Sequence, residues 1–416
     1  MRKTIQYSIV AALLGFYSCS TQQSMSTDSL LMGSWRGALD IGSGEEIPFL
    51  FDLTREDGQI IWSISNGQEK ITANEITLKG DSLIVNMPVF NSTFFLSKNG
   101  STKLKGYWQN FNKTTEYKIP FSATHGVTER FKVPENPLMD ELGGNTWEVL
   151  FSPKSEKPSP AIGMFNTKEA GYVEGSFATE KGDYRFLEGL YCDSLLRLSC
   201  FDGAHAFLFK AKKQNDGTLD GRFWSGHKYQ EDWSAQLNDH ASLKHPDSLT
   251  HIISSEKNVD FVFPDLDGNL VSFKDERFKN KALILQIMGT WCPNCADESV
   301  VYKDLYTKYK DKGLEIVALC FESTRDHKTA ARRIAKYKND IGFEYETLVA
   351  GYASKKEATQ TLEFLDEVSS FPTSVFIDKR GNVKRIHTGF YGPGTGEYFT
   401  NYLSELEAFI PTLLED

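Results

Sequence analysis

The stretch Gly289-Thr290-Trp291-Cys292-Pro293-Asn294-Cys295 decides the fold of the last third of this 416-residue chain. It directly follows Ala282–Met288, an unbroken apolar run with a single Gln, which is typical of a strand buried on both faces. It leads into residues 295–312, where apolar side chains recur at four-residue spacing until Gly313 ends the pattern, and this periodicity predicts a helix. The two cysteines therefore lie where a buried strand gives way to a helix.

The position of this cysteine pair predicts redox chemistry. A cysteine at a helix N-terminus faces unpaired backbone N–H groups and the positive end of the helix dipole, which favours its thiolate. Cys292 is thus the predicted nucleophile, and Cys295, one turn further, is the predicted resolving thiol and should be more buried. Zinc ligands and inert structural thiols are the alternatives, although the sequence has no second Cys-x-x-Cys and no His-x₃-His.

The segments around the pair alternate between strand-like and helix-like patterns. They are residues 261–266, 270–273, 314–321, 328–339, 374–378, 383–387 and 398–410. Strands that alternate with helices predict an α/β sheet. We interpret Cys320 as a buried core thiol, His387 as a surface residue of a strand, and the glycine-rich residues 389–396 as a loop near the cysteine pair.

Two motifs together resemble a known family. Trp291-Cys292-Pro293-Asn294-Cys295, with Phe371-Pro372-Thr373 downstream, is similar to the exported thioredoxin-like TlpA/ResA family over about residues 257–416. The resemblance implies a thioredoxin-like fold, a cis Phe371–Pro372 bond against the disulfide, and no cofactor besides the redox-active cysteine pair. It also implies disulfide-bonded proteins as substrates and a membrane electron donor. The alternative for Pro372 is an ordinary trans proline at the start of a strand.

Two further residues are assigned by their spacing from Cys292. Glu298, six residues later, matches the family's active-site glutamate, which is proposed to assist proton transfer. The alternative is a solvated glutamate in the first helical turn, stabilised by the helix N-terminus. Gln286, six residues earlier, stands where thioredoxin has a buried acid, and because Gln cannot titrate, more of the proton transfer falls to Glu298.

The first 240 residues carry a different pattern. Short β-rich runs, among them residues 48–54, 60–65, 71–79 and 83–87, are separated by turn residues at roughly ten-residue spacing, which predicts antiparallel sheet as a sandwich or small barrels. Residues 33–124 and 144–236 also look like two copies of one unit. The matched motifs are Gly33-Ser34-Trp35-Arg36 with Gly144-Asn145-Thr146-Trp147, Asp81-Ser82-Leu83 with Asp193-Ser194-Leu195, and Leu104-Lys105-Gly106-Tyr107-Trp108 with Leu219-Asp220-Gly221-Arg222-Phe223-Trp224.

These patterns predict a multidomain chain, with a duplicated all-β region followed by an α/β thioredoxin-like domain. The expected division is residues 31–124 and 144–236 for the β repeats, 125–143 for a connector, 237–258 for a linker and 259–416 for the thioredoxin-like domain. In the second repeat, a turn at Asp193-Ser194 would place Cys192 opposite Leu195, which disfavours a disulfide between Cys192 and Cys200.

The N-terminus predicts export. Arg2 and Lys3 precede an apolar stretch, residues 5–16, that is too short to span a bilayer. Residues 1–18 resemble a bacterial lipoprotein signal, with Cys19 as the lipidated residue and residues 19–30 as a flexible tether; ordinary signal cleavage is the alternative. This interpretation predicts a protein of the bacterial cell envelope, on the periplasmic side, that touches the membrane only through its lipid. A net charge of −10 without a basic block argues against nucleic-acid binding.

The sequence therefore predicts an exported thiol–disulfide oxidoreductase that reduces or exchanges disulfides of envelope proteins. One alternative is a ligand- or partner-binding β protein with an accessory redox domain. Another is a thiol peroxidase, but that chemistry usually has Pro-x₃-Thr-x₂-Cys around its cysteine, and Thr290 is only two residues before Cys292.

Overall fold

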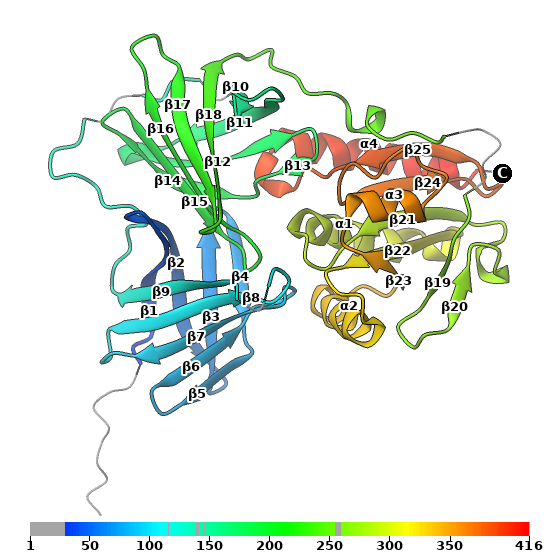
Figure 1. The fold of residues 1–416 in the computed structure, drawn as a ribbon, viewed down its shortest axis with the longest axis horizontal. Coiled ribbons are helices and arrows are strands. Elements are labelled where there is room, and N and C mark those ends of the chain that lie inside the picture. The colour runs from blue at the N-terminus through cyan, green and yellow to red at the C-terminus, as the bar shows by residue number, and fades with distance from the viewer. Residues whose placement is uncertain (1–29, 115, 139–140, 145, 254–258, 416) are drawn as a thin grey trace, which may run out of the picture.

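Two all-β units and one α/β domain follow one another along the chain (Figure 1). The structure is a computed structural model that describes residues 30–114, 116–138, 141–144, 146–253 and 259–415. The predicted signal, Cys19 and nearly all of the predicted tether lie outside the described residues.

Most strands of the two β units follow the same order in their sheets. The first contains β1 (Gly33–Gly42), β2 (Glu45–Glu56), β3 (Gln59–Asn66), β4 (Glu69–Ala73), β5 (Ile76–Lys79), β6 (Ser82–Asn86), β7 (Ser92–Lys98), β8 (Lys103–Asn110) and β9 (Lys118–His125). The second contains β10 (Thr146–Phe151), β11 (Ser159–Thr167), β12 (Tyr172–Thr179), β13 (Gly182–Asp183), β14 (Leu187–Cys192), β15 (Leu195–Phe201), β16 (Ala206–Lys213), β17 (Leu219–Ser225) and β18 (Tyr229–Leu237). Each sheet runs up and down and joins its first strand to its last, β1 to β9 and β10 to β18. The expected duplicated all-β region is confirmed.

The units differ in how they close. In the second unit β12 pairs with both β11 and β14, which completes a barrel. In the first unit the described strands β4 and β5 form the two ends of an open, curled sheet. The prediction of one strand over residues 71–79 was wrong, because the chain turns at Asn74, whose carbonyl accepts a hydrogen bond from the Ile76 N–H at 2.9 Å.

Aromatic side chains fill the interior of both units. Phe51 stacks on Trp62 in the first, with ring centroids 3.7 Å apart, and Phe209 stacks on Phe223 in the second at 4.3 Å. Small barrels are normally filled by side chains in this way. The packing gives the interiors a structural role and does not favour ligand binding inside them.

The two β units are held against each other by apolar and charged contacts. Phe201 of β15 stacks on Phe49 of β2 at 4.7 Å, so the second unit contributes to the core of the first. Arg130, in the predicted connector, is buried, pairs with Glu188 at 3.1 Å and donates to the Ser199 carbonyl at 3.0 Å. Cys192 lies opposite Leu195 as expected, and both Cys192 and Cys200 are buried free thiols.

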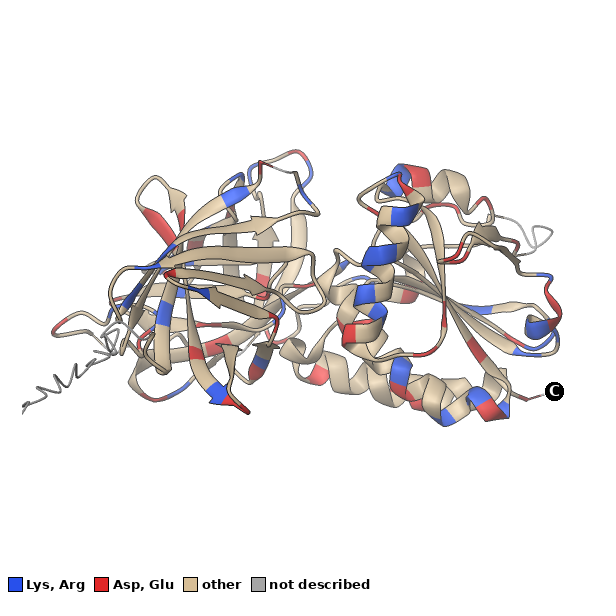
Figure 2. Ribbon diagram, turned by 90° about the horizontal axis from the view of Figure 1, so that it is seen from below, with Lys and Arg blue, Asp and Glu red and all other residues tan. Residues whose placement is uncertain are grey.

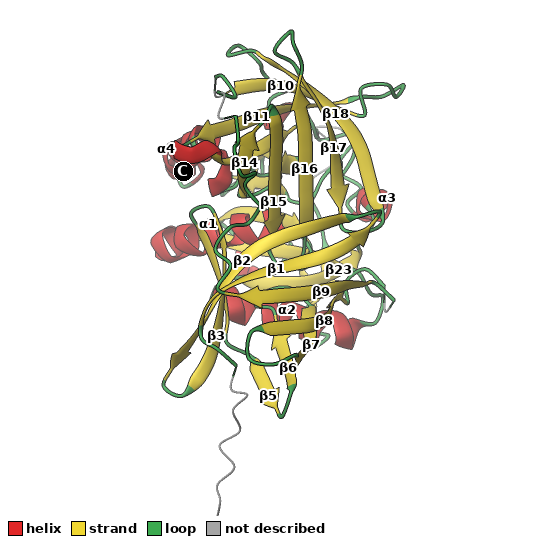
Figure 3. Ribbon diagram, turned by 90° about the vertical axis from the view of Figure 1, so that its left-hand side faces the viewer, coloured by secondary structure: helices red, strands yellow, loops and turns green. Residues whose placement is uncertain are grey.

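The α/β domain has the predicted thioredoxin-like fold. Its elements are β19 (Val262–Pro264), β20 (Leu270–Ser272), β21 (Ala282–Met288), α1 (Pro293–Tyr309), β22 (Leu314–Glu322), α2 (His327–Ile341), β23 (Glu346–Tyr352), α3 (Lys355–Thr361), β24 (Thr373–Ile377), β25 (Val383–Thr388) and α4 (Glu397–Leu413). The main sheet has the order β23-β22-β21-β24-β25, with β21 to β23 parallel and the last two strands antiparallel. Basic residues recur along α2, as the sequence pattern indicated (Figure 2). The β units lie on one side of the helices of this domain (Figure 3). Among the described residues, no helix is long and apolar enough to cross a membrane.

The predicted linker packs on this domain over part of its length. Asp247 lies 2.7 Å from His387 Nδ1, and the Thr388 hydroxyl donates to the buried Thr250 hydroxyl at 2.8 Å. The interpretation of His387 as a surface residue was wrong: its strand is covered by the linker, and burial lowers the pKa of its imidazole despite the neighbouring Asp247.

Candidate active site

The cysteine pair lies at the start of α1, on the edge of the sheet where β21 ends. Cys292 is the N-cap residue, and the backbone N–H of Cys295 donates to its sulfur at 3.3 Å. Cys292 Sγ also lies 3.5 Å from the Phe371 carbonyl oxygen. Cys292 is 6% exposed and Cys295 is fully buried, which is the expected order. Burial and the hydrogen bond to Cys292 raise the pKa of the Cys295 thiol well above its usual range.

The segment over residues 370–373, here called the proline loop, lies against the cysteine motif. The Phe371–Pro372 bond is cis, as the resemblance implied. The Trp291 ring meets Phe371 edge to face at 5.5 Å, and its indole N–H donates to the Phe321 carbonyl at 2.9 Å. Thr373 is buried, and its hydroxyl donates to the Ser370 carbonyl at 2.9 Å. The structure thus brings Trp291 and the carbonyl of the cis Phe371–Pro372 bond close to Cys292, with Thr373 buried just after that bond.

Glu298 lies in the protein interior, one helical turn after Cys295. Its carboxylate accepts hydrogen bonds from Gln286 Nε2 and the Ser374 hydroxyl, each at 2.9 Å. The solvated alternative was wrong, because this face of α1 packs on the sheet and leaves Glu298 fully buried. Burial raises the pKa of Glu298 to about 7, against the opposing effect of these hydrogen bonds.

A second buried carboxylate, which the sequence analysis missed, fixes the loop before Cys292. The Thr290 backbone N–H and hydroxyl donate to Glu322 at 2.9 and 2.8 Å. Burial raises the pKa of Glu322 as well. A charged residue directly after the apolar run at 314–321 was the available signal.

The second β unit also reaches the motif, which the sequence gave no means to anticipate. Asn294 Nδ2 donates to Asp183 Oδ1 at 3.2 Å and to the Phe390 carbonyl at 2.9 Å. Arg185 donates to the Pro293 carbonyl at 3.2 Å and to Asp297 at 2.7 Å. The loop over residues 389–396 therefore lies beside the cysteine pair as expected, and the β unit lies there too.

Comparison with known proteins places this geometry in a family. Residues 255–386 match the AhpC/TSA family. The ResA thiol-disulfide oxidoreductase of Bacillus thuringiensis subsp. konkukian (strain 97-27) is 34% identical over 146 residues, which cover 35% of this chain and 74% of that protein. ResA of Bacillus anthracis is 31% identical over 146 residues, with the same two shares covered. The chain belongs to the ResA family of thiol-disulfide oxidoreductases.

Membership of the ResA family confirms the resemblance and makes the chain a disulfide reductase or interchange enzyme. Among solved structures, a thiol:disulfide interchange protein from Chlorobium tepidum TLS is similar, with a TM-score of 0.30 and 19% identity over 39% of this chain and 100% of that chain.

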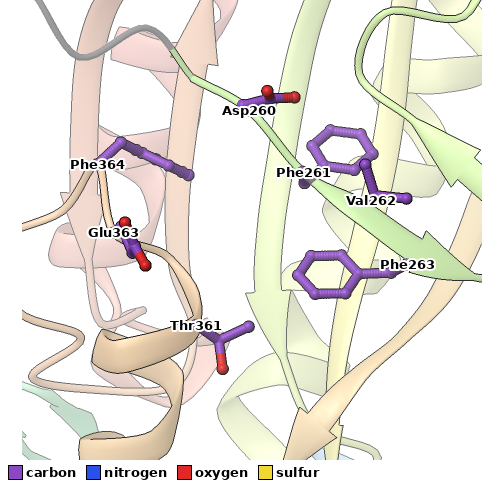
Figure 4. Close-up of a pocket in the computed structure, with 7 residues that line it drawn as sticks. All are labelled: Asp260, Phe261, Val262, Phe263, Thr361, Glu363 and Phe364. Carbon is purple, nitrogen blue, oxygen red and sulfur yellow. The ribbon is translucent and has the colours of Figure 1, made fainter.

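A cleft of about 350 Å³ lies elsewhere on the ResA-family domain, between β19 and the segment after α3 (Figure 4). None of its lining residues belongs to the cysteine motif; they are Asp260, Phe261, Val262, Phe263, Thr361, Glu363 and Phe364. The redox chemistry is therefore assigned to the start of α1 and not to this cleft.

The burial of Glu298 predicts a pH-dependent stability. Raising its pKa from 4.5 to about 7 on folding corresponds to about 3 kcal/mol of stability that is present below about pH 4.5 and lost as the pH rises through 7. Glu298→Gln keeps partners for Gln286 and Ser374 without a charge. We expect this variant to be more stable than the wild type by up to about 3 kcal/mol at pH 8 and equally stable at pH 4.

Denaturant titrations of the reduced protein at both pH values measure the difference. The control is Glu276→Gln, at a side chain that is 86% exposed, for which we expect a change within about 0.5 kcal/mol at either pH. The same gain for Glu298→Gln at pH 4 and pH 8 would contradict the assignment.

Proposed function

We propose that this chain is an exported oxidoreductase that reduces or exchanges disulfides of cell-envelope proteins through Cys292 and Cys295. The observation that carries the proposal is the hydrogen bond from the Cys295 N–H to Cys292 Sγ at the start of α1. A sulfur in this position can carry negative charge, because the helix N-terminus stabilises it.

The reaction proceeds in two exchanges. The Cys292 thiolate attacks one sulfur of the substrate disulfide, forming a mixed disulfide and expelling the other substrate sulfur as a thiolate, which takes up a proton. Cys295 then loses its proton and attacks Cys292 Sγ, which releases the second substrate thiolate and leaves a Cys292–Cys295 disulfide. The substrate gains two electrons and the enzyme loses two; a membrane electron donor returns them.

Glu298 is the proposed proton acceptor for Cys295. The two residues lie three apart on α1, so their side chains share one face of the helix. The raised pKa of the Cys295 thiol makes a nearby base necessary, and a carboxyl with a pKa of about 7 suits that role near neutral pH. Gln286 and Ser374 orient this carboxyl through their hydrogen bonds.

The two-step scheme predicts opposite behaviour of the two cysteine variants. Cys295→Ser should accumulate a mixed disulfide on Cys292, because the resolving thiol is missing, whereas Cys292→Ser should form none. Both variants should lose turnover of a protein disulfide by about 100-fold or more. Non-reducing electrophoresis with mass spectrometry identifies the trapped species. Cys192→Ala, in the β region, is the control and should retain turnover; trapping on Cys295 instead would refute the assigned order.

Export and lipid anchoring are the second part of the proposal. Support comes from the N-terminal sequence, where Arg2 and Lys3, an apolar stretch and Cys19 follow in the order of a lipoprotein signal. A lipid on Cys19 would hold the enzyme at the membrane, within reach of an electron donor embedded there.

The anchor predicts a change of compartment on substitution. In a bacterial host, the full chain should sediment with membranes and enter the detergent phase on phase separation, and Cys19→Ala should leave that phase. Cys192→Ala serves as the matched cysteine control and should stay with the membranes. A wild-type chain that is found entirely in the aqueous phase would exclude lipidation.

A further inference from the structure

A turn of the second β unit is seated on the redox site. It comprises residues 181–185, which include β13, and it touches the proline loop and the cysteine motif at once. The Ser370 hydroxyl, two residues before Pro372, donates to the Lys181 carbonyl at 2.9 Å. Asp183 accepts from Asn294 inside the motif at 3.2 Å and from the Gly392 N–H at 2.5 Å.

Arg185 fastens this turn. Its guanidinium pairs with Asp297 of α1, with Glu69 of the first β unit and with Asp202 of the second, so the three parts of the chain meet at one buried cation. Arg185 is itself held in a left-handed backbone conformation, with φ of 59°, and its own N–H donates to Asp183 at 2.9 Å. Breaking such a buried pair leaves an uncompensated charge, which makes this docked arrangement costly to disrupt at Arg185.

The contact is too close for another chain to pass between the surfaces. A Cβ added at Gly182 would lie 2.7 Å from Asn294 Nδ2, and one added at Gly389 would lie 2.8 Å from the Lys181 carbonyl carbon. A Cβ at Gly394 would lie 2.7 Å from the Arg185 carbonyl oxygen. The turn and the redox domain thus meet backbone to backbone.

Little of the reactive face beside this contact is exposed. Cys292 is 6% exposed, Phe371 is 7% exposed and Asn294 is 8% exposed. To bring a surface disulfide to Cys292, a folded protein would have to lie across the motif, the proline loop and residues 389–392. The turn already contacts all three of these segments and so occupies that space. A disulfide in a small molecule or in an extended segment needs to reach only the small exposed part of Cys292.

We propose that residues 181–185 are a specificity element, which admits disulfides of small or extended substrates to Cys292 and excludes disulfides on the surface of folded proteins. The inference rests on the proposed function and deepens it, because it gives the second β unit a role in choosing the substrate. The two-step exchange at Cys292 and Cys295 is unchanged.

Forcing the turn away from the motif tests the proposal. Gly182→Leu places a side chain where even a Cβ meets Asn294, without altering any residue of the redox domain. The matched control is Gly217→Leu in the same β unit, at φ of +85°, where a Cβ has nothing within 4 Å. The substrates are oxidised glutathione as the small disulfide and folded insulin as the protein disulfide.

We expect Gly182→Leu to raise the rate constant for insulin by about tenfold and to change that for oxidised glutathione by less than about twofold. The control should behave as the wild type with both. Equal insulin rates for the wild type and a folded Gly182→Leu variant would overturn the proposal.

Thiol labelling of the unaltered chain gives a second, independent readout. For each reagent, the rate constant of reduced Cys292 is divided by that of free glutathione. This ratio should be at least about tenfold larger for N-ethylmaleimide than for a polymer-linked maleimide, because the turn excludes the bulky reagent from Cys292. Equal relative rates would overturn the proposal even if Gly182→Leu failed to fold. Failure to reduce either disulfide would instead refute the proposed function, while the labelling ratio would still decide whether the turn covers Cys292.

Discussion

The hydrogen bond from the Cys295 N–H to Cys292 Sγ is the contact on which the chemistry of this protein depends. It exists because α1 begins at Pro293, directly after a cysteine in an extended conformation. Other residues of the site hold the chain in place on both sides of Cys292. Thr290 is tied to Glu322 on one side, and the Pro293 carbonyl is tied to Arg185 on the other.

The site is supported by polar groups buried beneath it, which stability alone does not explain. Burying a carboxyl without full compensation costs free energy, and the raised pKa values of Glu298 and Glu322 report that cost. Glu298 retains hydrogen bonds that keep it oriented under the helix, and its pKa of about 7 lets it exchange a proton near neutrality. A buried acid that is costly for stability is thus suited to proton transfer.

The two β units also contribute to the redox site, because they hold a turn against it. Their interiors are packed with aromatic rings, and they are joined to each other through Phe201, Phe49 and Arg130. A rigid pair of units can hold a turn against the redox motif with the accuracy that backbone-to-backbone contact requires.

Features that depend on local patterns could be predicted from the sequence. The motif between Ala282–Met288 and α1, the basic helix α2 and the hairpin of Cys192 could all be predicted from spacing and turn residues. The burial of Glu298 could not be predicted, because an early turn of a helix can face the sheet or the solvent with the same sequence. The split of the predicted strand at 71–79 depended on one turn at Asn74.

Contacts between distant segments were beyond prediction for a physical reason. Arg185 and Asp297 are 112 residues apart, and no sequence pattern around either residue predicts that the two form an ion pair. His387 was misjudged for the same cause, since Asp247 covers it from 140 residues away. Such tertiary ion pairs follow from the packing of whole units and leave no periodic signal in the sequence.

Reactivity of the reduced full chain toward a small alkylating agent tests the central claim most directly. Iodoacetamide is added at pH 7, and mass spectrometry follows each cysteine with time. We expect Cys292 to be modified first, faster than a free peptide thiol, and Cys295 to follow far more slowly. Modification of Cys295 first, or of Cys292 no faster than a free peptide thiol, would contradict it.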